Sequence, residues 1–200
     1  INTRTAWYSK SVSGETNLDD SYGHDKDGGW EGVPLNFPII QGADCCGEIV
    51  LVGDQVDAHR VGERVLVRTM QQYAVDYRPY ECWTMGSECD GAFAQYMVAF
   101  SKETFKIDSD WSDLELATIP CAYSTAENLL ERSNVKKDEV VLITGASGGV
   151  GSAAIQLAKR RGAKVIAIAS KEKSLEVQKI GADIVINLSL IHISEPTRRR

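Results

Sequence analysis

Four glycines lie within the seven residues from 145 to 151, and this loop is the part of the sequence best suited to chemistry: Gly145, Gly148, Gly149 and Gly151. The loop fits Gly-x-x-Gly-x-x-Gly, with Ala146 in the first glycine position of Gly-x-Gly-x-x-Gly. It follows an apolar run and precedes a helical pattern, so the helix start would present free amides and a partial positive charge to phosphates. Glycine at 148 lets a backbone approach a pyrophosphate, and glycine at 151 lets helix and strand pack closely. We therefore expect a dinucleotide to bind at Ser147, Gly148, Gly149, Val150 and Gly151.

The end of the next apolar run indicates which dinucleotide is bound. An acidic residue there would bind the ribose 2′-hydroxyl of NADH and repel the 2′-phosphate of NADPH. The sequence has Ser170 and Lys171 at this point, followed by Glu172 and Lys173. This favours NADPH over NADH, with Ser170 and Lys171 as binding residues. Glu172 would reverse the preference if the register were shifted by one or two residues.

Adjacent cysteines in "QGADCCGEIV" form the second candidate site. Cys45 and Cys46 could bind a metal, since thiolates are good zinc ligands, or could form a redox pair. They also fall at the start of a β-type run, where alternate side chains point into a core, and unpaired cysteine is often simply buried. We interpret the pair as core residues and keep the other two readings open.

Two sequence regimes must position these residues. Residues 1–110 carry short β-type runs separated by Gly, Pro and Asp, whereas helices and strands alternate from Trp111 onward. The pattern after Trp111 begins with a capping box at Ser112–Glu115. The expected helices span 123–132, 150–161 and 171–180, and the expected strands 140–144, 164–169 and 184–187. Continuous apolar strands between helices predict a parallel sheet with helices on both faces.

Composition is that of a globular protein without a membrane or nucleic-acid role. The 200 residues are 43% hydrophobic and 25% charged, with a net charge of −6. No apolar run is long enough to span a bilayer, and the acidic balance gives no basic surface for nucleic acid. Five cysteines, an odd number, suggest a reducing compartment rather than a disulfide framework, so we expect a cytoplasmic protein.

Several separate motifs, in this order, resemble the medium-chain dehydrogenase/reductase superfamily, the group of zinc-type alcohol dehydrogenases and quinone oxidoreductases. They are "FPIIQGADCCGEIVLVGDQVDAHRVGERVLV", "GAFAQYMV", "TIPCAYSTAENLL", the glycine loop and "IGADIVIN", and they cover most of residues 33–187. The resemblance implies an α/β protein with a GroES-like β-barrel domain in residues 1–110, its N-terminal part missing, and a partial Rossmann domain in residues 111–187. It also implies more chain at both ends and a homodimer for the full-length protein. Residues 188–198 resemble the translation of a transposon-type sequencing adapter, so we expect residues 188–200 to be a non-native tail.

The resemblance also bears on zinc. In zinc-dependent relatives a His-Glu pair follows the glycine at the position of Gly42, and this histidine binds the catalytic metal; here Ala43 and Asp44 follow. Cys121 matches a second ligand position of the family, but a catalytic zinc needs three protein ligands and alanine has no donor atom. We therefore expect no metal site. By resemblance, Thr125 contacts the nicotinamide, and Tyr123 is a weaker candidate for lining the catalytic site.

These expectations together predict a zinc-independent, NADPH-dependent oxidoreductase that transfers hydride to a small-molecule acceptor, a quinone or an activated alkene or carbonyl. One alternative is a zinc-dependent alcohol dehydrogenase in which a cysteine replaces the missing ligand. Another is a non-enzymatic NADPH-binding protein that kept the fold.

Overall fold

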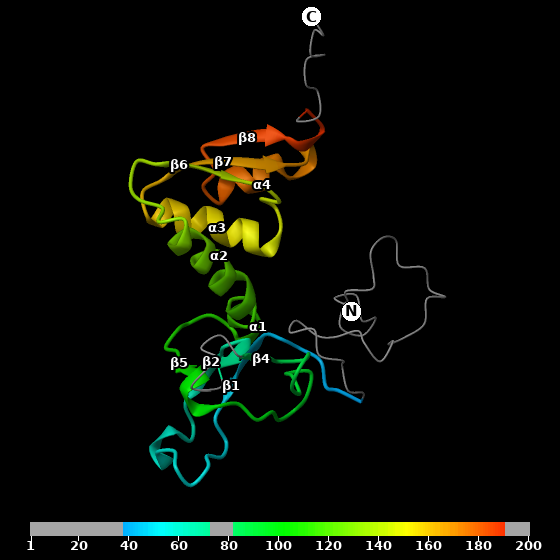
Figure 1. Ribbon diagram of the computed structural model, residues 1–200, viewed down its shortest axis with the longest axis vertical. Coiled ribbons are helices and arrows are strands. Elements are labelled where there is room, and N and C mark those ends of the chain that lie inside the picture. Colours follow the sequence, from blue (N-terminus) through cyan, green and yellow to red (C-terminus); the bar gives the residue numbers. More distant parts are fainter. Residues whose placement is uncertain (1–37, 73–81, 191–200) are drawn as a thin grey trace, which may run out of the picture. The chain divides into compact units, whose positions relative to one another are not determined.

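The computed structural model describes residues 38–72 and 82–190, which form parts of two compact units, Ile1–Pro120 and Cys121–Arg200 (Figure 1). In the described residues, no helix is both long and apolar enough to cross a bilayer. The two units are considered separately below. The domain limits expected at residues 110 and 187 stay a prediction.

The first unit is built from two small antiparallel sheets. Strands β1 (Cys45–Glu48), β2 (Arg64–Val67) and β5 (Thr104–Lys106) form one sheet in the order β1-β2-β5. Strands β3 (Met70–Gln72) and β4 (Cys82–Thr84) form a two-stranded ribbon. The unit also contains three short helices, η2 (Ala58–Arg60) before β2, η3 (Ser101–Glu103) before β5 and α1 (Asp113–Leu116) after β5. The core of this unit is small, with Val65, Val67 and Met85 buried and Cys45 and Cys89 packed against them.

Close contacts at glycines hold the segment before β1 in place. Gly42 has a φ of +107°, a left-handed conformation that disfavours any side chain. Ala92 N donates to Gly42 O at 2.9 Å, and a Cβ on Gly86 would lie 2.6 Å from Gly42 N. Residues 40–42 are thereby clamped against residues 91–93, and this clamp positions Ala43 and Asp44.

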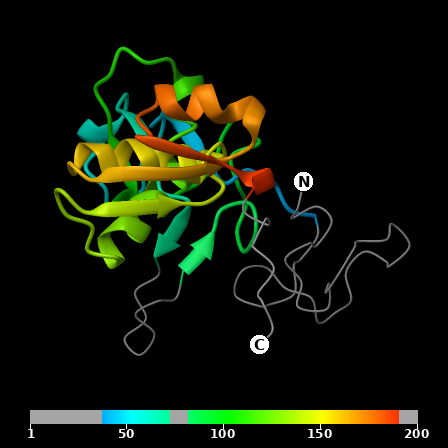
Figure 2. The ribbon, with the colours of Figure 1, turned by 90° about the horizontal axis from the view of Figure 1, so that it is seen from above.

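The second unit has the expected parallel sheet. Its elements are α2 (Pro120–Arg132), β6 (Val140–Ile143), α3 (Gly149–Arg160), β7 (Lys164–Ala169), η4 (Lys171–Lys173), α4 (Ser174–Lys179), β8 (Ile184–Asn187) and η5 (Leu188–Leu190). Strands β6, β7 and β8 lie side by side and run in the same direction (Figure 2). The expected strand bounds at 164–169 and 184–187 are confirmed.

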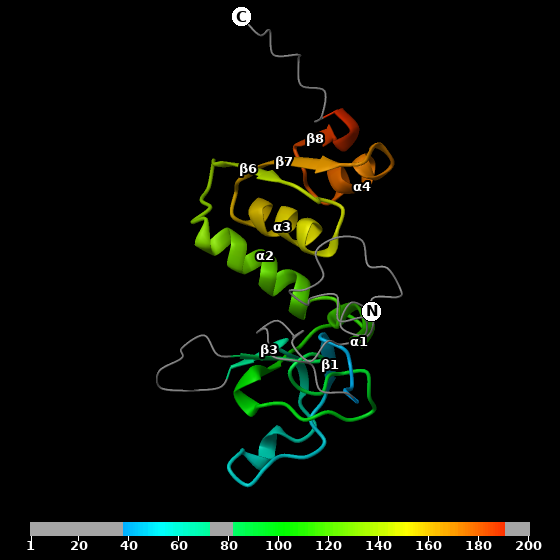
Figure 3. The same ribbon diagram turned by 45° about the vertical axis from the view of Figure 1, so that its right-hand side comes forward.

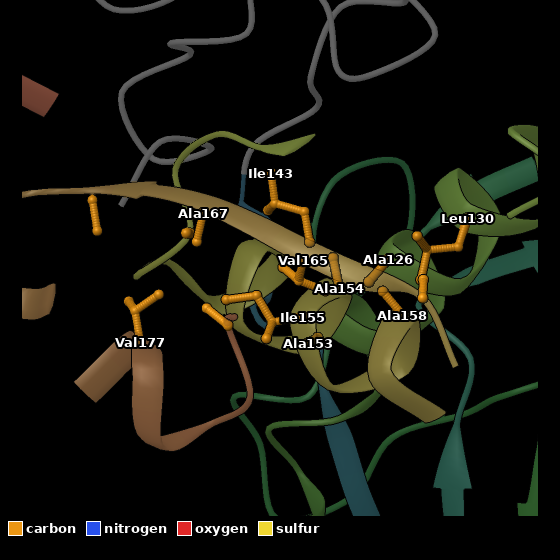
Figure 4. Packing of buried hydrophobic residues seen from close by; sticks show 14 residues of the cluster. Ala126, Leu130, Ile143, Ala153, Ala154, Ile155, Ala158, Val165, Ala167 and Val177 are labelled. Atoms are coloured by element: carbon orange, nitrogen blue, oxygen red, sulfur yellow. The ribbon is translucent and has the colours of Figure 1, made fainter. Parts of the chain in front are cut away.

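One face of this sheet carries the core of the second unit. Strand residues including Ile143, Val165 and Ala167 pack against small and branched side chains of α3, and Val177 of α4 joins the same cluster (Figure 4). Alanine is the commonest residue type in the cluster, which lets α3 lie close to the strands. Helix α2 adds Ala126 to this core.

The other face of the sheet is apolar and uncovered in the part of the chain that the structure describes. Val140, Leu142, Ile184 and Ile186 are 62, 58, 54 and 37% exposed. Helices α2, α3 and α4 all lie on the opposite side (Figures 1 and 3). Within the described residues, the helices of this part of the sheet therefore cover one face. The physical reason is that β6-α3-β7 and β7-α4-β8 are successive right-handed crossovers running in one direction, which places both helices on one face.

Candidate functional site

The start of α3 is an uncapped helix N-terminus made by the glycine loop. Gly145, with a φ of +59°, turns the chain out of β6, and Gly148 N donates to Gly145 O at 3.0 Å. Gly148 is the N-cap residue, and no side chain there bonds to the helix amides. Ser152 N donates to Gly148 O at 2.8 Å, so the amides of residues 149–151 precede the intrahelical ladder. Three amides and the positive end of the helix dipole therefore face outward together, an arrangement suited to a phosphate.

Close packing between α3 and the loop requires a residue without a side chain at position 151. Gly151 is buried, and a Cβ there would lie 2.8 Å from Ala146 Cα and 2.9 Å from Gly145 C, with the carbonyl oxygen of Gly145 closer still. Gly149 is different, because its Cβ would lie 3.6 Å from Ala122 Cβ, an ordinary contact. Gly151 thus keeps the start of α3 close to the loop that follows β6, and its predicted role in dinucleotide binding stays a prediction.

A cavity of about 330 Å³ lies beside this loop, and its lining is mainly apolar: Leu129, Ile143, Thr144, Gly145, Gly148, Val150, Gly151 and Ala154. The volume is within the range of small-molecule sites. Apolar walls beside an uncapped helix start suit a ligand with a flat ring and a phosphate. The residues present therefore fit a dinucleotide. Of the residues predicted from the sequence, the structure brings Gly148, Val150 and Gly151 to the cavity, while Ser147 and Gly149 are exposed in the same turn.

Helix α2 brings its first turns beside this loop. Helices α2 and α3 lie side by side with their starts at the same end, as the contact between Ala122 and the position of Gly149 also shows (Figure 3). Thr125 is exposed and lies one turn before Leu129, so both residues occupy the same face of α2, and Leu129 lines the cavity. Thr125 is thus placed near the glycine loop.

Tyr123 lies on a different face of α2. Its hydroxyl accepts a hydrogen bond from Gln156 Nε2 at 3.0 Å, well along α3. It lines an open groove of about 550 Å³ with Ser124, Glu127, Leu157, Arg160 and Arg161. The structure therefore separates Tyr123 from Thr125, and a catalytic role for either stays a prediction.

The end of β7 holds the residues expected to select the dinucleotide. Ser170 is the N-cap of η4, and its carbonyl oxygen accepts from Ser174 Oγ at 3.0 Å. Lys171 is exposed. Its own backbone N–H and the Ser170 hydroxyl lower the pKa of the Glu172 carboxyl below its usual value. The charged form of the acidic side chain that could reverse the predicted preference is therefore favoured by its immediate neighbours.

The adjacent cysteines of β1 have different surroundings. Cys45 packs against the core of the first unit, and burial raises the pKa of its thiol. Cys46 instead donates from Sγ to Asp113 Oδ1 at 3.6 Å; burial first, and then this carboxylate, raise the pKa of its thiol. The core interpretation is confirmed for Cys45 and wrong for Cys46, because successive strand residues point to opposite sides.

The two thiols nearest Ala43 in the sequence lie in surroundings that raise their pKa. Zinc binds thiolates, and the surroundings of both Cys45 and Cys46 favour the protonated thiol. Among residues 38–72 and 82–190, no three His, Cys, Asp or Glu side chains are grouped so that they could hold a metal ion. Cys121 is half-buried in the first turn of α2.

Two family models match the chain. The alcohol dehydrogenase GroES-like domain matches residues 13–109, and the zinc-binding dehydrogenase model matches residues 149–198. Curated relatives include the acryloyl-coenzyme A reductase of Metallosphaera sedula, 31% identical over 76% of this chain and 48% of the relative. The NAD-dependent alcohol dehydrogenase of Saccharolobus solfataricus is 30% identical over 80% of this chain and 49% of the relative. This chain thus spans about half the length of these relatives.

Solved structures agree in fold. A protein from Sinorhizobium meliloti 1021 has a TM-score of 0.72 at 45% identity, covering 77% of this chain and 43% of that chain. The quinone oxidoreductase from Coxiella burnetii has a TM-score of 0.59 at 31% identity, covering 80% and 47%. These matches confirm the expected fold class, a GroES-like domain followed by a Rossmann domain. The chain belongs to the zinc-type alcohol dehydrogenase group of the medium-chain dehydrogenase/reductase superfamily.

Proposed function

We propose that the whole protein is an NADPH-dependent oxidoreductase that reduces a quinone or an activated alkene or carbonyl without zinc. The single observation that carries the proposal is the uncapped start of α3 beside an apolar cavity. There the amides of residues 149–151 would hold the pyrophosphate, and Gly151 keeps helix and strand close enough to form the cradle. When bound, the nicotinamide supplies the hydride, and the protein supplies position and polarity.

The preference for NADPH over NADH is supported at the end of β7. Lys171 is an exposed cation next to Ser170, and both can accommodate a 2′-phosphate. Glu172 would oppose this only if its carboxylate reached a ribose hydroxyl, and its immediate neighbours in η4 are its own amide and the N-cap residue Ser170. We expect Lys171→Ala to weaken NADPH binding about tenfold and NADH binding little, and Lys179→Ala, in the last turn of α4, serves as the control. Equal loss for both dinucleotides would contradict this assignment.

Thr125 is the residue we assign to the nicotinamide end. It is exposed on the α2 face that also carries the cavity residue Leu129, and its hydroxyl can donate to a carboxamide. Its role is to orient the ring, so Thr125→Val should lower kcat while Thr125→Ser retains most of it. No acid or base in the described residues is assigned to protonation of the product, which we assign to solvent.

The proposal of an acceptor that is already electron-poor rests on the side chains near Ala43 that would have to bind zinc. Zinc ionises alcohols by acting as a Lewis acid, and Ala43 together with the protonated thiols of Cys45 and Cys46 does not supply its ligands. Quinones and conjugated alkenes accept hydride without such help when hydrogen-bond donors stabilise the developing oxyanion. The names of two relatives, an acryloyl-coenzyme A reductase and a quinone oxidoreductase, fit this substrate class.

A zinc-dependent alcohol dehydrogenase is the second candidate, favoured by Cys121 at a family ligand position and by relatives named alcohol dehydrogenases. Metal content per chain distinguishes the two, measured on full-length protein purified without chelator. Zinc well below one per chain, together with NADPH oxidation by a simple quinone or enone, supports the proposal. One zinc per chain, lost in Cys121→Ala, supports the alcohol dehydrogenase. NADPH binding without turnover across the acceptor panel indicates the third candidate, a non-enzymatic binding protein. We place the protein in the cytoplasm, in keeping with its odd number of cysteines.

A further inference from the structure

Three residues spaced four apart form a stripe along α2 that contacts α3 and its C-cap residue, Arg161: Tyr123, Glu127 and Glu131. The shortest of these contacts joins Arg161 to Glu127. Arg161 Nη2 donates to Glu127 Oε1 at 2.6 Å, and Nη1 donates to Oε2 at 3.1 Å. Nη2 also lies 3.6 Å from Glu131 Oε2. One guanidinium therefore ties two successive turns of α2 to the end of α3.

The geometry of this ion pair makes it stronger than an ordinary surface pair. Many exposed ion pairs contribute little, because solvent and side-chain entropy offset the attraction. Here the side chain of Arg161 is only 19% exposed, and its two bonds to Glu127 are bidentate. A planar guanidinium that makes two bonds fixes direction as well as distance. The pair therefore restrains the rotation of α2 about its own axis, and the bond from Gln156 to Tyr123 adds to this restraint.

The buried residues of α2 lie between this stripe and the candidate site. Ala126 and Leu130 face the core of the second unit. Successive residues of an α-helix are about 100° apart, which puts Glu127 on one flank of this buried face and Leu129 on the other. Thr125 lies beside Leu129, which lines the cavity. A rotation of α2 about its axis would therefore move the Thr125 hydroxyl relative to the glycine loop.

We propose that Arg161 is a positioning residue: by binding Glu127 and Glu131 it fixes the rotation of α2 and so places the hydroxyl of Thr125. The inference rests on the proposed function insofar as Thr125 acts on the cofactor. Arg161 follows the last turn of α3, whereas the glycine loop precedes the first, and the residues that line the cavity beside the loop do not include it. Arg161 thus acts through α2, and every residue involved belongs to the second unit.

Lys159 provides a matched control at the same end of α3. Its Nζ lies 2.8 and 2.9 Å from the two carboxylate oxygens of Asp183. Asp183 directly precedes β8, so this ion pair ties α3 to the sheet. Methionine in place of either cation removes the charge and keeps most of the side-chain length. Lys159→Met therefore removes a comparable ion pair without releasing the stripe of α2.

The first readout is hydrogen exchange of the amides of residues 121–132 in full-length Arg161→Met, Glu127→Met and Lys159→Met proteins. Both variants of the Arg161–Glu127 pair should exchange about fivefold faster or more, because a helix with fewer contacts opens more often, and Lys159→Met should change little. Glu127 is half exposed, and methionine matches glutamate in helix propensity, so Glu127→Met provides the test if Arg161→Met does not fold. Unchanged exchange in both, or equal acceleration in Lys159→Met, would overturn the inference.

The second readout is steady-state kinetics with a simple quinone and NADPH. Arg161→Met should lower kcat about tenfold, because the group that orients the ring is misplaced, with an unchanged Kd for NADPH. In a Thr125→Val background the same substitution should lower kcat little further, because the hydroxyl that Arg161 positions is already absent. An equal loss of kcat in both backgrounds would show a merely structural role and overturn the inference. If wild-type protein turned over no acceptor, the proposed function would fail, and hydrogen exchange would still decide whether Arg161 holds α2.

Discussion

Replacing Gly151 by alanine tests the central feature of the site, the close approach of α3 to the loop after β6. The new Cβ would lie 2.8 Å from Ala146 Cα and 2.9 Å from Gly145 C, whereas carbon atoms rest at about 3.5–4.0 Å. The obstructing atoms are backbone, so no side-chain rotation relieves the clash. The start of α3 must move away from the loop by about half an ångström or more.

The magnitude follows from two opposed effects. Overpacking a buried position costs about 1–3 kcal/mol, and alanine in place of glycine favours a helix by up to about 1 kcal/mol. The net loss in the free energy of unfolding should be about 1–2 kcal/mol. That corresponds to a factor of about 5–30 in the opening equilibrium of the second unit.

Gly149→Ala is the matched control, because it makes the same chemical change two residues earlier in the same helical turn. Its Cβ would meet only Ala122 Cβ, at 3.6 Å. This variant should leave stability unchanged or raise it by a few tenths of a kcal/mol.

The assay is hydrogen exchange of the amides of residues 140–169, read by mass spectrometry, with NADPH affinity measured on the same samples. Gly151→Ala should speed exchange about 5- to 30-fold and weaken NADPH binding, whereas Gly149→Ala should not speed exchange. Equal exchange rates in the two variants would refute the close-approach argument. The helix start would then have room for a side chain that the structure does not allow.

Two further predictions concern the sheet of the second unit. The double variant Leu142→Lys/Ile184→Lys places charges on the uncovered face, so light scattering should show less aggregation, and the free energy of unfolding should change by less than about 0.5 kcal/mol. As a control, lysine at the buried Val165 should unfold the unit. Increased scattering in the double variant would contradict the assignment of faces. Asp183 accepts from Lys159 Nζ at 2.8 Å and from Val165 N at 2.6 Å, bonds that lower its pKa from the usual 3.8. Because the folded-state pKa is the lower one, its stabilisation is complete above the unfolded-state pKa and is lost as pH falls through the folded-state value. Urea midpoints of Asp183→Asn should therefore lie below those of the wild type at pH 6–7 and approach them below about pH 4, and a gap that stays constant with pH would contradict the charge argument.

Local sequence patterns were sufficient to predict much of the secondary structure of the second unit. The bounds of β7 and β8 agree with the apolar runs that predicted them, since each run is bounded by glycine or polar residues. Ser112 and Glu115 predicted a capping box because both partners lie within one turn. Helix α2 begins at Pro120, three residues earlier than expected, because proline is well tolerated in the first turn of a helix.

What a side chain contacts across the fold was decided by tertiary structure. Cys45 and Cys46 are indistinguishable by residue type, yet one packs in the core and the other bonds to Asp113, 67 residues away. Thr125 and Tyr123 are close in the sequence, but Tyr123 accepts a hydrogen bond from Gln156 of α3, whereas Thr125 is exposed on the face of α2 that carries the cavity residue Leu129.

The sequence by itself determined the elements, the glycine loop and the family, because these depend on residues within a few positions of one another and on the order of motifs. Tertiary structure alone decided that both crossover helices cover one face of the sheet and that Arg161 binds Glu127, 34 residues away. The physical reason is that such contacts depend on how distant segments meet in the folded chain, and the local periodicity of the sequence does not predict which segments meet.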